Sequence, residues 1–385
     1  MNRRGFIAVG GACCALAAAG AQGQEQEPWR APGRFARPDI ASDEGGLWAM
    51  MDREERNLRR SPFVIRDRSL NEYLQGIACK LAGEHCPDVR VHVVNTPLFN
   101  ANMAPNGMMQ VWSGLLLRME NEAQVAAVIG HEIGHYLEKH SLERLRDAKS
   151  ASAFAQFMGM LGPVGALGQL AVLAGMFSYS RDQERRADVL GVTMMHRAGY
   201  DPAEAGKVWT HLLQELKARP GGDPTANSPM FATHPSAEER SESLVALAAK
   251  LPGGAAHADT WEEKIRPFRR DWLKEEIKRG QHEESIALLT RMSESAKAQP
   301  DYRYARGEVY RLRAKEGDLD LALADLRAAT TLGGEPPETH RGLGLILRAR
   351  RQPAEAKASF LRYLEMAPSA PDQAMIKSYI EELGT

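Results

Sequence analysis

The stretch AAVIGHEIGHYLEKHS, residues 126–141, carries three histidines and a glutamate directly after the first of them. Its apolar residues recur at helical spacing and predict a helix. On a helix that advances about 100° per residue, His131 and His135 lie one turn apart, so both imidazoles can reach one metal ion. His140 falls on the opposite face, and no glycine or proline lies between His135 and His140 to break the helix. We therefore expect His140 to be a surface or helix-end residue.

Glu132 follows the first histidine, which places its carboxylate beside a bound ion, where a general base belongs. A catalytic zinc site needs three protein ligands and an open fourth position, and two histidines are not enough. Glu184 and Asp188 are four residues apart and share one helical face. Glu184 can reach the metal while Asp188 accepts the second ring N–H of a ligand histidine. The alternative is a solvent-facing charge cluster with the neighbouring arginines.

Composition limits the function classes. The chain of 385 residues is long enough for two or three domains, with 49 lysines and arginines against 50 aspartates and glutamates. Because these charges nearly cancel, the chain offers no large positive field for a phosphate backbone. Nucleic acid is therefore not expected as a partner.

The N-terminus predicts export. Residues 1–23 combine a positive start, a short apolar stretch and small residues before a cleavage site, which is typical of a cleaved signal. Arg3 and Arg4 leave a twin-arginine signal and a general secretory signal both open. Residues 24–40 are expected to be a flexible lead-in. In an oxidising compartment, Cys79 and Cys86 are expected to form a disulfide, the alternative being a zinc site with His85.

Periodicity outlines the part of the chain around the histidines. Helices are expected over 42–58 and 68–82, and strands over 89–95 and 107–116, which would form a small hairpin-like sheet. Residues 151–178 carry no charge, but GPVG divides them into two pieces. We expect a helical hairpin, packed in the domain or in peripheral contact with a membrane surface, rather than a true span.

The C-terminal part carries a repeat. EGDLDLALADLRAATTL (316–332) and RQPAEAKASFLRYLEMAP (351–368) superimpose at an offset of 34 residues, the tetratricopeptide period. A degenerate copy at 278–292 and a capping helix at 372–383 complete an expected α-solenoid over 262–385, after a first domain over 41–252. An unrelated helical bundle is the alternative.

Five motifs in order along the chain resemble those of a known family. HEIGH (131–135), ERRAD (184–188) and AGYDP (198–202), with FNANMAPNGMMQVWSGLL upstream and THPSAEER (233–240) downstream, resemble the HtpX and CAAX prenyl endopeptidase family of zinc metallopeptidases. The resemblance implies a mainly α (α+β) fold, with a helical gluzincin-type domain and a small β-sheet. It implies one zinc ion (Zn2+) per chain, held by His131, His135 and Glu184, with Glu132 as general base.

The same resemblance places His234 and Arg240 near the zinc, where a donor or cation can stabilise an oxyanion. A second hypothesis is that His234 swings onto the zinc and displaces water in a resting state. An extended substrate is expected to pair with the strand near 108–112, which makes the candidate substrate contacts Asn100, Met108, Met109, Gln110 and Val111.

The combination of export signal, peptidase domain and repeats resembles periplasmic members of the family that take part in outer-membrane protein assembly. It implies an endopeptidase that cleaves unfolded or misassembled envelope polypeptides, with a protein partner, such as the outer-membrane assembly machinery, bound by the repeats. Two alternatives stay open. One is a chaperone or assembly factor whose protease activity is minor or latched, and the other is a membrane-embedded protease.

Overall fold

The computed structural model describes residues 31–147, 179–221, 228–234, 237–294 and 299–384, and residues 33–385 cluster as one compact unit. The expected export signal, 1–23, and the uncharged segment, 151–178, lie outside the described residues. No helix within the described ranges has an apolar stretch long enough to cross a membrane.

A three-stranded sheet lies at the centre of the first half of the chain. Its strands are β1 (Arg90–Val94), β2 (Ala101–Met103) and β3 (Met108–Trp112), in the order β1-β3-β2. β1 pairs with β3 in parallel, whereas β2 pairs with β3 in antiparallel fashion. The expectation that the two predicted strands, which are β1 and β3, form a hairpin is therefore wrong, because they pair in parallel and the segment between them contributes β2. Residues 113–116, expected to be the end of the last strand, lie in a helix over Ser113–Arg118 instead.

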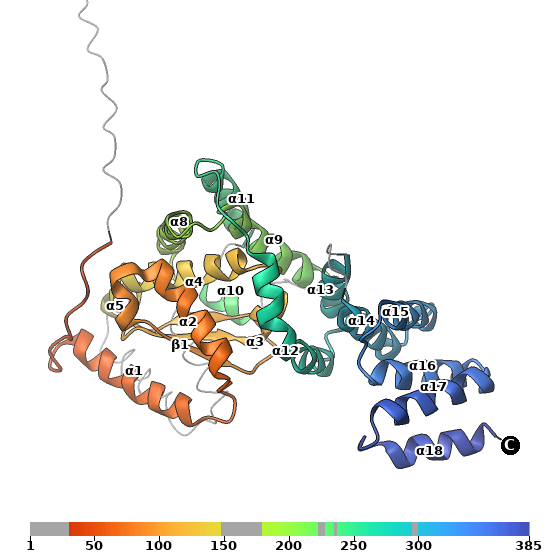
Figure 1. Ribbon diagram of the computed structural model, residues 1–385. Coiled ribbons are helices and arrows are strands. Elements are labelled where there is room, and N and C mark those ends of the chain that lie inside the picture. The colour runs from red at the N-terminus through yellow and green to blue at the C-terminus, as the bar shows by residue number, and fades with distance from the viewer. Residues whose placement is uncertain (1–30, 148–178, 222–227, 235–236, 295–298, 385) are drawn as a thin grey trace, which may run out of the picture. The chain divides into compact units, whose positions relative to one another are not determined.

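Two helical layers enclose this sheet (Figure 1). α1 (Asp43–Arg60) starts at Ser42, whose side chain caps the helix, and α2 (Arg68–Ala82) starts at Asp67 in the same way. Both lie within two residues of the helices predicted from periodicity. On one face, Met108 and Trp112 pack with the apolar side of α1. On the other face lie α2 and the helix that carries the histidine motif.

The remaining helices of the first half follow the sheet. They are α3 (Ser113–Arg118), α4 (Glu122–Leu137), α5 (His140–Asp147), α8 (Arg181–Arg197), α9 (Ala203–Lys217), α10 (Pro229–Thr233) and α11 (Ala237–Ala248). α4 packs extensively on α8, and α9 packs on α4 and α11.

The second half is built of helices throughout its described residues (Figure 1). They are α12 (Ala258–Lys278), α13 (His282–Glu294), α14 (Pro300–Arg313), α15 (Asp318–Leu332), α16 (Glu338–Ala349), α17 (Pro353–Met366) and α18 (Gln373–Glu382). α14 pairs with α15 and α16 with α17. Ala322 and Ala356, which the 34-residue offset superimposes, are both fully buried, as are Leu326 and Phe360.

A disulfide ties the end of α2 to the short 3-10 helix η1 (Gly83–Asp88). Cys79 and Cys86 are joined, with their Cα atoms 4.5 Å apart, as expected from the sequence.

Part of the lead-in is docked on this region, which corrects the expectation of a flexible segment up to residue 40. The ring of Phe35 lies 5.2 Å from the rings of both His85 and Tyr136, and Arg34 forms an ion pair with Asp88. Residues 33–40 therefore belong to the folded unit.

Candidate metal centre

α4 presents the two histidines of the opening motif. Asn121 caps the helix, its side chain accepting from the amide N–H of Gln124 at 2.9 Å, and every residue of α4 is buried. His131 and His135 point the same way, so that their Nε2 atoms are 3.0 Å apart. Because burial lowers the pKa of both rings, they are held as neutral imidazoles, the form that binds a metal.

α8 brings the expected third group to them. A capping box of Ser180 and Gln183 starts the helix one residue before Arg181. Glu184 then lies with Oε1 3.3 Å from His135 Nε2 and Oε2 3.5 Å from His131 Nε2. Burial by itself raises the pKa of Glu184, but the charges of His234 and Arg240 bring it well below its usual value. The carboxylate is therefore ionised and fit for a cation.

The close contact of α4 and α8 depends on small residues. A Cβ atom added at Gly191 would lie 2.8 Å from the backbone nitrogen of His131, and one added at Gly134 would lie 2.9 Å from the carbonyl oxygen of Ala187. Both contacts are with backbone atoms, which cannot move aside as a flexible side chain does. Glycine at these positions lets the backbones approach closely enough for Glu184 to meet the histidines.

Asp188 and Arg240 contact the candidate ligand cluster, which His131, His135 and Glu184 form. Asp188 Oδ1 lies 2.8 Å from His131 Nδ1, the nitrogen on the far side of that ring, as the sequence spacing predicted. Arg240 donates to both oxygens of Asp188, and its Nη1 lies 3.0 Å from Glu184 Oε2. Its guanidinium also stacks 3.7 Å above the ring of Trp209. Arg240 thus holds both carboxylates in place, and its contact with an oxyanion stays a prediction.

Glu132 lies beside the ligand cluster without belonging to it. Burial raises the pKa of this carboxyl to about 7. A backbone hydrogen bond from Met103 of β2 and the nearby His234 and Arg240 favour its ionised form. A carboxyl that titrates near neutrality is well matched to accepting and returning a proton.

His234 is part of the same cluster. It follows α10, and its Nδ1 lies 2.9 Å from Glu184 Oε1 and 3.2 Å from His131 Nε2. One ligand atom from each of His131, His135, Glu184 and His234 falls within 4.8 Å of all the others. His234 therefore lies near the proposed metal position, as both hypotheses for this residue expect, and the choice between them stays a prediction.

These donors fit a zinc ion. A tetrahedral zinc ion with bonds of about 2.0–2.1 Å separates its ligand atoms by about 3.3 Å. The measured separations between the donor atoms of His131, His135 and Glu184 are 3.0, 3.3 and 3.5 Å. Two neutral imidazoles and one carboxylate form a donor set found in catalytic zinc sites.

His140 differs from expectation. α4 ends at Leu137, Lys139 adopts a positive φ of 54°, and α5 begins at His140, so the chain turns where a continuous helix was predicted. His140 is fully buried, and its Nδ1 lies 2.8 Å from Nδ1 of His135. It remains outside the ligand cluster, but the prediction of a surface position is wrong.

Two further neighbours of the site, both aromatic, were not predicted from the sequence. Tyr179 stacks on the ring of His135 at 3.8 Å, and Trp209 lies 6.2 Å from the ring of His131. Each comes from a stretch without a recognisable motif, so only the tertiary structure reveals these contacts.

The expected substrate strand also needs correction. β3 lies between β1 and β2, and its residues Met108, Met109, Gln110 and Val111 are buried, as is Asn100. Both sides of β3 are therefore occupied along its pairing with β1 and β2, and an extended peptide has no free edge there. β2 is the edge strand that packs on α4, and its Met103 contacts Glu132.

A helix with two histidines one turn apart, a glutamate between them and a carboxylate from a second helix define a metallopeptidase site. Residues 65–248 match the model of peptidase family M48, and the chain therefore carries an M48 peptidase domain. This confirms the family resemblance found in the sequence motifs.

Curated relatives agree with the family. The mitochondrial metalloendopeptidase OMA1 of Arabidopsis thaliana is 31% identical over 179 residues, which are 46% of this chain and 33% of the relative. The beta-barrel assembly-enhancing protease of Escherichia coli is 28% identical over 225 residues, 53% of this chain and 45% of the relative. A putative beta-barrel assembly-enhancing protease of Vibrio cholerae is 28% identical over 201 residues, 48% of this chain and 40% of the relative. The chain thus spans less than half the length of each of these proteins.

Proposed function

We propose that the protein is a zinc-dependent endopeptidase, with His131, His135 and Glu184 as the metal ligands and Glu132 as the general base. The single observation that carries this proposal is the convergence of the ligand atoms beside a buried carboxyl whose pKa is about 7. A zinc ion in this position supplies Lewis acidity, which acidifies water and polarises a peptide carbonyl.

Residues of the chain orient the metal ligand, transfer the proton and hold the substrate. Asp188 fixes the ring of His131 through its Nδ1, so that Nε2 is free to bind. Glu132 takes a proton from water on its carboxylate and passes it to the departing amine. An extended substrate pairs with β2 rather than β3, since β2 is the edge strand that packs on α4. Pairing of this kind selects unfolded segments over compact ones.

Glu132→Gln tests this proposal. The variant keeps its metal content, because Glu132 is not a ligand, and loses peptide cleavage by about 10²–10⁴-fold, the usual contribution of a general base. Glu138→Gln, at the end of the same helix, is the matched control and retains cleavage of an unfolded protein such as casein. Retained cleavage in Glu132→Gln at unchanged zinc content would overturn the assignment.

A second candidate is a protein with latched proteolysis that acts mainly as a chaperone or assembly factor. The position of His234 among the possible ligands favours it, because a fourth protein ligand would take the place that water needs. Under this reading, His234→Ala raises cleavage at neutral pH. Unchanged or lower activity of the variant, at equal zinc content, would count against the latch.

Export to the periplasm and action on envelope polypeptides complete the proposal. The predicted signal at 1–23 and the disulfide Cys79–Cys86 support an oxidising compartment. The paired helices after α12, with Ala322 and Ala356 buried alike, support tetratricopeptide-like repeats that bind a protein partner. Two relatives carry names that describe β-barrel assembly, which supports a partner in the outer-membrane assembly machinery. Trapping with Glu132→Gln and identifying the bound proteins tests substrates and partners together.

A further inference from the structure

A cavity of about 270 Å³ lies where α12 meets the end of α3. One face of α12 forms its longest wall, since Trp261, Ile265, Arg269 and Trp272 recur at helical spacing along it. The end of α3 and residues of α13 and α14 form the other walls. None of the lining residues belongs to the metal centre.

Arg269 is the unusual residue of this cavity. Its side chain is 2% exposed, Nη2 donates to Glu262, and Nη1 lies 3.9 Å from a carboxylate oxygen of Asp301. Nε has no hydrogen-bond acceptor among the described residues. The guanidinium carbon lies 5.0 Å from the ring centre of Tyr302. Buried donors are almost always paired in folded proteins, because an unpaired one loses its water without replacement. The unpaired Nε donor of this buried side chain therefore calls for an acceptor from outside the chain.

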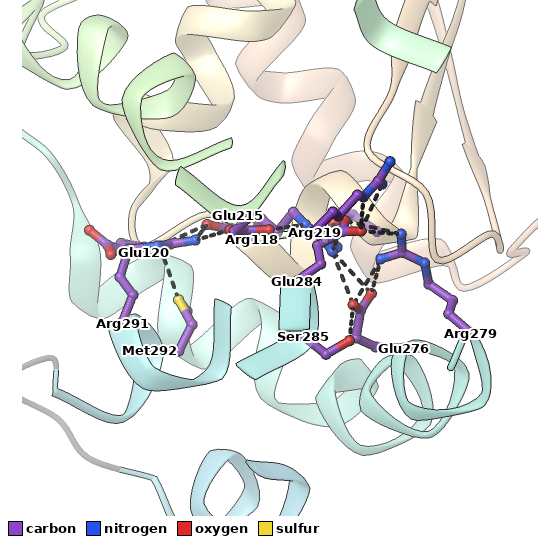
Figure 2. A network of polar contacts seen from close by, with 11 residues as sticks. Arg118, Glu120, Glu215, Arg219, Glu276, Arg279, Glu284, Ser285, Arg291 and Met292 are labelled. Carbon is purple, nitrogen blue, oxygen red and sulfur yellow. Dashed lines mark hydrogen bonds and ion pairs between the residues drawn. The ribbon is translucent and has the colours of Figure 1, made fainter. Parts of the chain in front are cut away.

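The walls of the cavity are held in place before any ligand arrives. The indole N–H of Trp261 donates to the carbonyl oxygen of Met119 at 2.9 Å, which leaves only hydrocarbon to face the cavity. Figure 2 shows Arg291 between Glu120 and Met292, two other lining residues. Its ion pair with Glu120 measures 2.7 Å. A preformed wall spares a ligand much of the ordering cost of binding.

Charge limits the class of ligand. The charged groups that line the cavity are the carboxylates Glu120 and Glu262 and the guanidinium of Arg269, and each is paired, Glu120 with Arg291 and Glu262 with Arg269. An anionic ligand would therefore find no unpaired positive charge, whereas a neutral carbonyl oxygen can accept from Nε of Arg269 without repulsion. The aromatic and aliphatic walls add a requirement for a bulky apolar group next to that carbonyl.

We propose that this cavity binds one large apolar side chain of an extended polypeptide, with an adjoining backbone carbonyl accepting from Arg269. The volume lies just below the roughly 300–1,000 Å³ of pockets for drug-sized ligands, which suits a single residue. The choice of a polypeptide rests on the proposed endopeptidase function. The cavity then holds a client segment outside the catalytic cleft, on the wall shared by the peptidase domain and the C-terminal helices.

Direct binding tests the inference without catalysis. The probe is an unstructured Gly/Ser peptide with one central Phe, blocked at both ends and labelled, titrated onto the full chain carrying Glu132→Gln. We expect it to bind at least about tenfold more tightly than the same peptide with Ala, because a hydrophobic pocket discriminates by such factors. Equal binding of the two peptides overturns the inference, and this comparison needs no change to the cavity.

Two variants locate the binding. Ile265→Phe fills the cavity and abolishes the preference for Phe over Ala, while Arg269→Lys keeps the charge, loses the Nε donor and weakens binding of the Phe peptide. The matched control is Leu273→Phe, on the same helix but lining a neighbouring cavity of about 250 Å³, which leaves the preference intact. A folded Ile265→Phe variant that still prefers the Phe peptide overturns the assignment to this cavity.

Decanoate distinguishes the ligand class. Displacement of the Phe peptide by low concentrations of this apolar anion would contradict the neutral-acceptor argument, whereas failure to displace supports it. If the proposed endopeptidase function is wrong, the unaltered chain does not cleave casein. That result is separate from the comparison of Phe and Ala peptide binding and does not change it.

Discussion

His135 is positioned by neighbours on both sides of its ring. His140 lies 2.8 Å from its Nδ1, and Tyr179 stacks on it at 3.8 Å. Burial lowers the pKa of His140 to about 4, so its ring is neutral at physiological pH. A neutral His140 can accept the Nδ1–H of His135, which fixes the tautomer that leaves Nε2 for a metal.

His140→Ala should therefore weaken metal binding without removing a ligand. We expect the metal affinity to fall by about 10–100-fold, the usual cost of losing such a partner. Zinc retention against increasing chelator concentrations measures it. His196→Ala, an exposed histidine on α8, is the control and should retain zinc like the unaltered chain. Equal retention in the two variants would show that His140 does not orient His135.

The convergence of the proposed metal ligands was predictable from the sequence, whereas the place of His140 was not. His131 and His135 share a face through helix geometry alone, and family motifs supplied Glu184. The turn before His140 depends on contacts that are distant in sequence. Lys139, at its positive φ, bonds Glu44 at 2.7 Å and lies 4.5 Å from the ring of Phe35. Helical periodicity carries no information about such contacts.

At the scale of elements, the contact of α4 with α8 decides whether the site exists. The two histidines come from one helix and Glu184 from the other, and glycines allow their backbones to touch. A shift between the helices changes the distances from the carboxylate of Glu184 to the two histidine rings.

Gly191→Ala should push the two helices apart. The added methyl group would lie 2.8 Å from the backbone nitrogen of His131 and 3.0 Å from the carbonyl carbon of Gly130. We expect a loss of about 1–3 kcal/mol in the free energy of unfolding, as for other overpacked cores, and reduced zinc content. The measurements are chemical denaturation and metal analysis.

Gly76→Ala, in α2, is the matched control for this substitution. No atom lies within 4 Å of the Cβ that it would add, so we expect a gain of about 0.5–1 kcal/mol from reduced chain entropy and unchanged zinc content. If both variants retained zinc and stability alike, close helix packing would not be what positions Glu184.

Local sequence patterns predicted the turn and two strands of the sheet but not how the strands pair. The turn at 105–107 was predictable because Gly107, at a φ of 88°, is the residue that tolerates this conformation. The two valine- and methionine-rich strands were found for the same local reasons. Their parallel pairing was missed because three-residue β2 lies between them in the chain and was too short to be recognised from alternation.

At the scale of the whole molecule, a buried charge network joins the peptidase domain to the C-terminal helices (Figure 2). Arg118, at the end of α3, is 3% exposed and contacts Glu215 of α9 at 2.7 Å, Glu276 of α12 at 3.1 Å and Glu284 of α13 at 3.4 Å. Arg219, Arg279 and Arg291 contact the same carboxylates, and Arg291 also pairs with Glu120. Four arginines therefore face four carboxylates in this network.

Arg118→Met should weaken this junction strongly, because it leaves three carboxylates buried around an apolar side chain. We expect a loss of about 3–5 kcal/mol in the free energy of unfolding, the cost of breaking a buried ion pair from one side. Arg348→Met removes an exposed pair with Glu382 and should cost about 0–1 kcal/mol. Adding Glu276→Leu to Arg118→Met should recover part of the loss, since one uncompensated charge is removed with its partner. Equal unfolding curves for Arg118→Met and Arg348→Met would mean that the network does not hold the two parts of the molecule together.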